Sequence, residues 1–248
     1  MKKILTYCFL FFVTCDFLTA QQSLFNVPGL TVTKNKEFFF QEQANITGDG
    51  VVVNFNTAYG LGKGFEIGVN LIGMGIQFNN NGANLLTYYS NARKLPFNPL
   101  VMLTGLKRFQ INKNFSAGIG TQVGFNPVVG QVYSSGIANF NYLEMKYELP
   151  DYHLMFVGGL YASNRIYTGQ GDLFGPMVGF EYAIIEHKLL IMADWIIGKN
   201  SISVAVPGFV YHPHHNVALS LGWQLTSPGA GNPSGLVFEL TIGNFSSK

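Results

Sequence analysis

The sequence predicts an all-β chain, a transmembrane antiparallel up-and-down β-barrel of about twelve strands. The first observation is that segments of about 10–14 residues alternate apolar residues with small or polar ones. A period of two is typical of a β-strand with one apolar and one polar face. About ten residues is also the length that a tilted strand needs to cross a bilayer. The clearest example is Val217–Thr226, in which every second residue is apolar: Val217, Leu219, Leu221, Trp223 and Leu225.

The second observation is the composition. Hydrophobic residues are 48% and the mean hydropathy is +0.21, yet charged residues are only 11%. A soluble domain usually carries about a quarter charged residues. Beyond the first 20 residues no run of 18 apolar residues occurs that could form a transmembrane helix. High hydropathy without helical spans favours a barrel, which satisfies its backbone hydrogen bonds within lipid.

The N-terminus predicts export. Lys2 and Lys3 precede the apolar run Ile4–Val13, and Leu18-Thr19-Ala20 offers a cleavage site, as in a secretory signal peptide over residues 1–20. A lipoprotein signal that uses Cys15 is the alternative. Cleavage after Ala20 would remove both cysteines, which fits an exported protein without disulfides. We therefore expect a bacterial outer-membrane protein, in which residues 21–36 form a periplasmic lead-in and residues 37–248 form the barrel.

The strand count rests on the order of the connections. Short turns are expected at 61–64, 110–113, 149–151, 186–187 and 213–215. They alternate with longer, Asn-, Gly- and Ser-rich connections at 78–97, 128–136, 165–172 and 228–233, and with tight turns at 48–50 and 198–200. Periplasmic turns and extracellular loops alternate in this way. The predicted strands are 38–47, 50–60, 64–77, 98–109, 114–127, 137–149, 152–164, 173–185, 188–198, 201–212, 215–227 and 234–245.

Residues 84–91 leave an alternative open, because they could form a thirteenth strand within a count of 14. That strand would move every later turn to the opposite end of the barrel. We therefore assign residues 78–97 to the longest outer loop, either as a lid or folded into the bore. Aromatic residues gather near strand ends, where interfacial girdles would lie. They are Phe38, Tyr59, Phe65, Phe109, Phe115, Tyr147, Tyr152, Phe174 and Tyr211.

Two stretches, residues 54–70 (NFNTAYGLGKGFEIGVN) and 114–122 (NFSAGIGTQ), resemble small outer-membrane β-barrels of Bacteroidota. The resemblance extends over most of the predicted mature chain in its strand rhythm. It implies a porin-like architecture in a Gram-negative outer membrane. It assigns neither a functional residue nor a solute to this chain.

If the apolar parity faces lipid, the opposite parity faces the lumen. Glycines at 68, 118, 120, 124, 179, 222 and 243 share that inner face and would leave room in the bore. Eight strands are just filled by their own side chains and 16–18 leave an open channel, so twelve predict a narrow hydrated lumen. The lumen-lining candidates are Asn54, Asn56, Glu66, Asn70, Gln122, Asn126, Tyr142, Glu144, Lys146, Glu181, Asp194, Ser220, Gln224, Glu239 and Thr241.

Carboxylates outnumber bases among these candidates, which predicts an acidic lumen that favours cations over anions. The alternative is a packed, salt-bridged plug made of Glu144, Lys146, Glu181, Asp194 and Glu239, because buried charges need partners in any case. Asp194 has apolar sequence neighbours, so it must find water or a cross-barrel partner such as Lys146 or Arg165. Glu42 shares the lipid-facing parity, which predicts either a bulge or a strand that leaves the membrane there.

The expected function is a narrow passive channel or uptake pore for small polar or weakly cationic solutes. The alternative is a non-conducting structural barrel that binds another envelope protein. Of the 15 basic and 13 acidic residues, 13 and 12 remain after loss of Lys2, Lys3 and Asp16, which argues against nucleic acid as a partner.

We expect no enzyme, no cofactor and no metal. His212-Pro213-His214-His215 is interpreted as a polar turn, and no Gly-x-Ser-x-Gly occurs.

Overall fold

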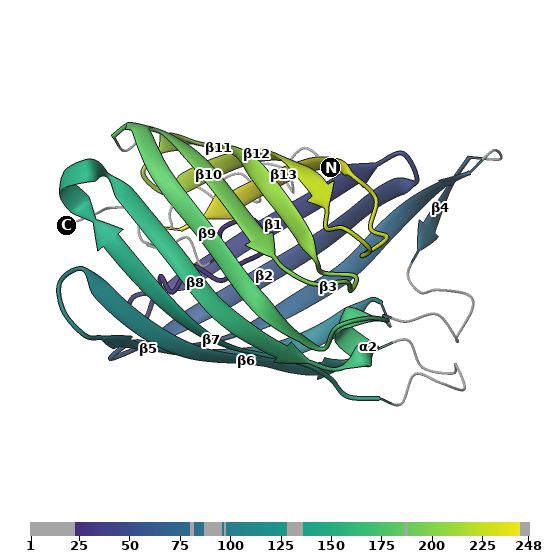
Figure 1. Cartoon of the computed structure of the whole chain (residues 1–248), viewed down its shortest axis with the longest axis horizontal. Coiled ribbons are helices and arrows are strands. Elements are labelled where there is room, and N and C mark those ends of the chain that lie inside the picture. The colour runs from purple at the N-terminus through teal and green to yellow at the C-terminus, as the bar shows by residue number, and fades with distance from the viewer. Residues whose placement is uncertain are drawn as a thin grey trace, which may run out of the picture.

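The twelve predicted strands form a closed antiparallel β-barrel. A computed structural model describes residues 23–79, 82–86, 96, 98–127, 136–186 and 188–243. Each wall strand pairs with its neighbours along the chain, and β1 pairs with both β2 and β13, which closes the ring (Figure 1). Closure leaves no unpaired wall edge, so every wall strand has partners for its backbone groups on both sides.

The wall strands are close to those expected from the sequence. They are β1 Phe38–Thr47, β2 Gly50–Gly62, β3 Phe65–Asn79, β5 Leu100–Gln110, β6 Phe115–Phe125, β7 Ala138–Leu149, β8 Leu154–Ser163, β9 Phe174–Ile185, β10 Leu189–Ile196, β11 Val204–His214, β12 Val217–Thr226 and β13 Gly235–Ile242. Two short helices connect strands, η1 Pro150–Tyr152 and α2 Arg165–Thr168. No helix within these described ranges is long and apolar enough to cross a membrane.

Short connections gather at one end of the barrel, which we call the turn end, and longer ones at the other, the loop end. The β2–β3 turn is a tight example, in which Gly62, Lys63 and Gly64 all have positive φ. A side chain at Gly64 would also place its Cβ 2.5 Å from the Arg108 carbonyl oxygen. Glycine is therefore required at position 64, because the backbone has a positive φ there and because a Cβ would clash with the Arg108 carbonyl oxygen. The predicted alternation of connections is confirmed throughout the described wall.

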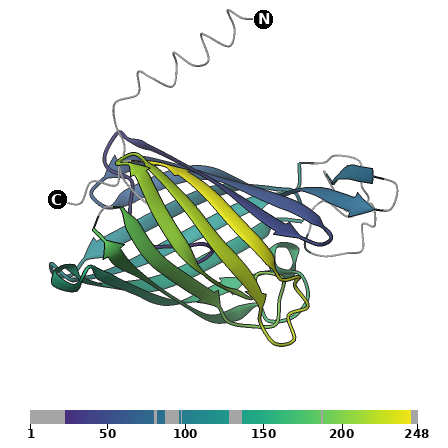
Figure 2. The ribbon, with the colours of Figure 1, turned by 90° about the horizontal axis from the view of Figure 1, so that it is seen from above.

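Residues 84–86, the described part of 84–91, do not add a strand to the wall. The five residues of β4, Gly82–Leu86, pair only with β3, at the loop-end part of that strand. The β3–β4 hairpin extends beyond the barrel rim (Figure 2). The alternation of turns is therefore preserved, and the count of 14 wall strands is wrong. The rest of the predicted outer loop lies largely outside the described residues.

The outer surface is apolar and the inner one is closed to solvent over much of its area. In β12, Leu221, Trp223 and Leu225 are 51%, 51% and 46% exposed, whereas Ala218 and Ser220 on the other face are 1% exposed. The same two-residue alternation is clear in β6, β7 and β9. An apolar belt of this kind matches the hydrocarbon core of a bilayer.

Two details of the outer surface bear on the sequence prediction. The register of β1 against β2 and β13 has no shift around Glu42, so a bulge is excluded, and Glu42 lies opposite Phe55 and Leu240. Most of the expected aromatic residues are exposed at strand ends, Phe38 and Tyr152 at the turn end and Phe174 at the loop end among them, whereas Tyr59 and Phe115 are half-buried.

The apolar belt makes a depth-dependent prediction. Leu221→Arg places a charge midway along β12 and should lower the free energy of folding into lipid vesicles by about 2–4 kcal/mol, whereas Leu61→Arg at the turn-end rim should cost about 0–1 kcal/mol. Denaturant titration of folding into vesicles measures both. Equal costs for the two variants would mean that this face does not contact lipid.

Candidate functional site

The N-terminal part of the described chain occupies the bore. Residues 21–36 were expected as a lead-in outside the barrel, but their described part, from Ser23, enters it. Leu24, Val27 and Leu30 are 0% exposed although they belong to no strand or helix. The physical reason is their apolar character, because these side chains are removed from water only inside the barrel. We call residues 23–33 the lumen segment.

A tight turn at the start of the lumen segment is fixed by a wall carboxylate. The Leu24 N–H donates to the Val27 carbonyl oxygen at 2.9 Å, and Ser23 bridges to Pro28. The turn presents the backbone N–H groups of Asn26 and Val27 to Asp194 on β10. Both donate to Asp194 Oδ2, the second at 2.7 Å. The partner of Asp194 is thus the main chain of the lumen segment, and the expected pairing with Lys146 or Arg165 does not form.

Other polar groups of the wall hold the lumen segment along its length. On β1 and β3, Gln43 Nε2 donates to the Phe25 carbonyl oxygen at 3.0 Å, and the Thr33 N–H donates to Glu66 Oε2 at 2.7 Å. The remaining contacts are Ser23 Oγ to Gln41 Oε1 at 2.8 Å, Lys146 Nζ to Thr31 Oγ1 at 3.3 Å and Arg108 Nη1 to the Leu30 carbonyl oxygen at 3.5 Å. The anchors come from β1, β3, β5, β7 and β10, so the segment is tied to most of the circumference.

Glycines on the inner face make room for the apolar side chains of the segment. An added Cβ at Gly179 would lie 2.3 Å from Leu24 Cδ1, and one at Gly118 would lie 2.4 Å from Leu30 Cδ2. At Gly222 it would lie 2.7 Å from Phe25 Cζ. The inner glycines were expected to leave an open bore. The space at Gly118, Gly179 and Gly222 is instead filled by the lumen segment, and the space at Gly120 is filled by the Tyr142 ring.

One side of the interior is an apolar core. Leu24, Phe25 and Val27 pack into a cluster with inward residues from seven consecutive strands. These are Phe140, Val157, Tyr161, Met177, Met192, Ile196, Val204, Val206, Val210, Ala218 and Val237, from β7 to β13. Burial of each large apolar side chain contributes about 1.5–3 kcal/mol. The segment is therefore packed into the barrel as well as hydrogen-bonded to it.

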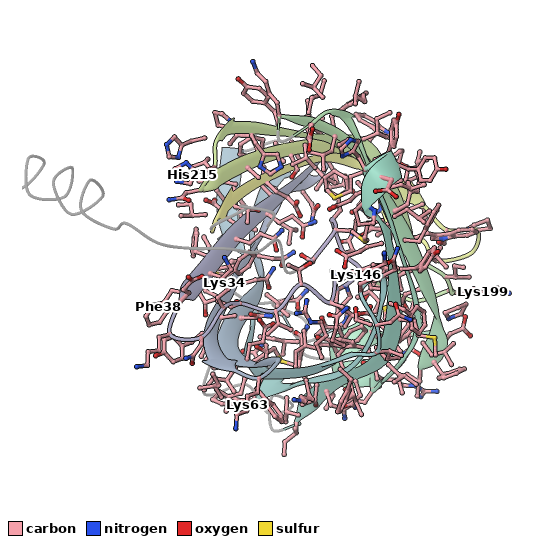
Figure 3. All side chains as sticks on the ribbon, turned by 90° about the vertical axis from the view of Figure 1, so that its left-hand side faces the viewer. Lys34, Phe38, Lys63, Lys146, Lys199 and His215 are labelled. Atoms are coloured by element: carbon pink, nitrogen blue, oxygen red, sulfur yellow. The ribbon has the colours of Figure 1, made fainter. Side chains whose placement is uncertain are left out.

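A cavity of about 390 Å³ remains toward the loop end. Ser23, Phe25, Asn26 and Pro28 form one of its sides, and loop-end residues such as Ser201 and Asn232 form another. Lys146 and Gly118, inner residues near the turn end, do not line it, whereas Glu66, the second residue of β3 after the turn-end connection, does. The lumen segment therefore lies between this cavity and the turn end on the side of β6 and β7, and the cavity extends toward the turn end along β3 (Figure 3, in which Lys146 points into the ring of strands).

The predicted lumen residues fall into two groups. The first lines the cavity: Asn54, Asn56, Glu66, Asn70, Gln122, Tyr142 and Gln224. The second lies on the inner wall but outside the cavity lining: Glu144, Lys146, Glu181, Ser220, Asp194, Glu239 and Thr241. Asn126 follows the last residue of β6 and is half-buried. The expected ring of carboxylates around the cavity is therefore absent among the described residues, where Glu66 is its one acidic side chain.

The second group does not form the salt-bridged plug. Lys146 Nζ pairs with Glu148 Oε1 at 3.1 Å. Glu144 and Glu239 are 0% exposed; the Glu144 carboxylate oxygens have no hydrogen-bond partner among the described residues, and Glu239 has only the side chains of Ser220 and Gln41 beside it, outside ideal hydrogen-bond geometry. Ser220 is the cross-strand neighbour of Glu239. A buried carboxylate without partners is costly, so these two groups would gain free energy from water or a cation in the bore.

Sequence reasoning missed a second feature, a polar network that ties three loop-end connections together. Asn200, which is 0% exposed, donates through Nδ2 to Tyr161 Oη at 2.9 Å and to the Asp172 carbonyl oxygen at 2.5 Å. Asn232 Nδ2 donates to the Asn200 carbonyl oxygen at 3.0 Å. Ser201 Oγ donates to the Thr168 carbonyl oxygen at 2.8 Å. The loop-end boundary of the cavity is therefore structured on this side.

Comparisons with known proteins inform the fold. No family model matches the chain, and no curated protein matches it. Among solved structures, the "KdgM porin in complex with disordered oligogalacturonate" aligns with a TM-score of 0.55 at 10% identity, over 83% of this chain and 98% of that one. The outer membrane channel DcaP of Acinetobacter baumannii aligns with a TM-score of 0.33 at 9% identity, over 84% of this chain and 96% of that one. The first alignment supports the barrel fold.

The contact between Gly179 and Leu24 gives a prediction. Gly179→Ala should displace Leu24 and loosen the turn at Asp194, because overpacking costs about 1–3 kcal/mol. Hydrogen exchange at the Asn26 and Val27 N–H groups should accelerate about tenfold or more. Gly105→Ala, whose Cβ would have no atom within 4 Å, is the matched control. Unchanged exchange in both variants would contradict the packing of the segment described above.

Proposed function

We propose that this protein is an outer-membrane channel for small polar or weakly cationic solutes and that the lumen segment closes it. The observation that carries the proposal is the nature of the closure. Residues 23–33 fill part of the bore and are held there by hydrogen bonds and apolar packing, and a cavity remains beside them. A closure of this kind can be displaced without unfolding the wall, because the backbone pairing from strand to strand does not involve it.

The residues beneath the segment suit an aqueous passage. Glu144, Asp194 and Glu239 lie on the inner wall, and Glu144 has no hydrogen-bond partner among the described residues while the segment is in place. Displacement of the segment would hydrate these carboxylates and release the cost of burying them. Rings of carboxylates favour cations in channels. The open state is therefore the one in which the preference for weakly cationic solutes arises.

The neighbouring KdgM porin supports the passage of polar solutes through a barrel of this kind, since it has been solved with oligogalacturonate. The predicted signal peptide lies outside the described residues, and export to the outer membrane remains part of the proposal.

A specific observation favours the second candidate, a non-conducting structural barrel. The lumen segment is tied to five strands and contributes to the apolar core, as a permanent internal support would. The two functions differ in whether the bore conducts once the segment has been removed.

Replacement of residues 23–33 by a Gly-Ser stretch of equal length separates the two. The variant should show sustained current steps in planar bilayers with cations preferred, because the side chains that close the bore are gone. A heat-modifiable gel shift reports that the barrel has folded. A folded variant that remains silent would overturn the channel and leave the structural barrel.

A matched pair of substitutions tests the charge preference in the variant whose lumen segment has been replaced. Glu239→Gln should lower cation selectivity, since Glu239 lies on the inner face of β13. Glu42→Gln, on the outer face of the adjacent β1, should leave it unchanged. Equal effects would mean that Glu239 does not face the passage.

A further inference from the structure

The cavity toward the loop end is rich in carboxamide side chains. Amides from β1, β2, β3, β6 and β12 share its lining, with two more from the loop end. They include Gln41, Gln43, Asn54, Asn56, Asn70 and Gln122. Each carboxamide carries one acceptor oxygen and two donor hydrogens. The wall can therefore donate to and accept from the same solute group, as a hydroxyl requires.

These amides are held in place by one another. Asn54 Nδ2 donates to Gln43 Oε1 at 3.2 Å, and Asn70 Nδ2 donates to Gln122 Oε1 at 3.4 Å. Asn54 Oδ1 accepts the Gly73 N–H at 2.8 Å. Gln122 Nε2 has no partner among the described residues and is available to a ligand. Side chains fixed in advance lose little conformational entropy when a ligand binds.

A separate part of the lining is aromatic. Phe140 on β7 stacks on Tyr167 of α2 with ring centroids 5.2 Å apart, and Tyr142 lies 5.8 Å from Phe140. All three rings line the cavity. A pyranose ring has apolar C–H faces and a polar rim of hydroxyls, so aromatic faces together with amides match both of its surfaces.

The charge of the lining restricts the ligand further. The described lining residues include no Lys, Arg or His, and Glu66 is the one carboxylate among them. Glu66 Oε2 already accepts the Thr33 N–H at 2.7 Å. An anionic sugar would find no cation among these described lining residues, whereas a neutral one leaves no charge unpaired.

We infer that this cavity is a binding site for a neutral saccharide of one or two pyranose units. Its volume of about 390 Å³ is near the lower limit of the roughly 300–1,000 Å³ typical of small-molecule sites, which sets the size of the ligand. The inference deepens the proposed function, since it names a solute class for the same bore. Binding itself requires no displacement of the lumen segment.

Isothermal titration of the full chain in detergent tests the inference with three probes: maltose, digalacturonate and the cationic disaccharide of glucosamine. Maltose should bind at least about tenfold more tightly than digalacturonate, because the anion finds no base in the lining. Digalacturonate binding as tight as maltose binding, or no heat with any probe, would overturn the inference.

Substitutions of lining residues test whether maltose binds in this cavity. Gln122→Leu and Asn56→Leu should each weaken maltose binding about two- to tenfold, the effect of losing one hydrogen bond. Gln110→Leu, exposed at the turn end of β5 and outside the lining, is the matched control and should bind maltose as the wild type does. If neither lining variant binds more weakly than Gln110→Leu while both show the heat-modifiable shift, the site is not in this cavity.

The outcomes for binding and conduction are distinguishable. Maltose binding by a barrel that never conducts would uphold the saccharide site and overturn the channel alone. A conducting barrel with no preference for maltose would uphold the channel and overturn the saccharide site alone.

Discussion

The interior depends on one constraint: a ring of twelve tilted strands encloses more space than its own inward side chains fill. Inner glycines at 118, 179 and 222 enlarge that space, and the lumen segment occupies it with Leu24, Phe25 and Leu30. The Asp194 carboxylate fixes the position of the segment by accepting two backbone N–H groups. Everything else about the lumen follows from this filling: the apolar core on the β7–β13 side, the buried carboxylates beneath, and the amide-lined cavity above.

The wall could be predicted from the sequence because its signal is local. Alternation with a period of two fixes which side chains of Val217–Thr226 face outward, and the burial of Ala218 and Ser220 agrees with it. The order of short and long connections fixed the number of wall strands, since one extra crossing would place each later turn at the wrong end. Parity likewise placed Glu66, Asn70 and Gln122 on the inner face, where they line the cavity.

The contents of the bore could not be predicted in the same way, because they depend on contacts between residues far apart in the sequence. Asn26 and Asp194 are separated by 168 positions. Nothing in the apolar neighbours of Asp194 indicates that its partner is a main-chain turn instead of Lys146 or Arg165. A signal was present in the apolar residues Leu24, Phe25, Val27 and Leu30, which an exposed lead-in would leave in water. The same filling explains why Glu144 and Glu239 do not line the cavity.

The central claim is that passage requires the lumen segment to leave its position, and a reversible lock tests it most directly. Leu24→Cys with Gly179→Cys joins two adjacent positions, since a Cβ at Gly179 would fall 2.3 Å from Leu24 Cδ1, and the predicted mature chain has no other thiol. In planar bilayers the oxidised double variant should be silent, and reduction should restore current. Each single variant should not respond to the reductant. Equal current before and after reduction of a fully cross-linked sample would contradict the account, because solute would then pass with the segment in place.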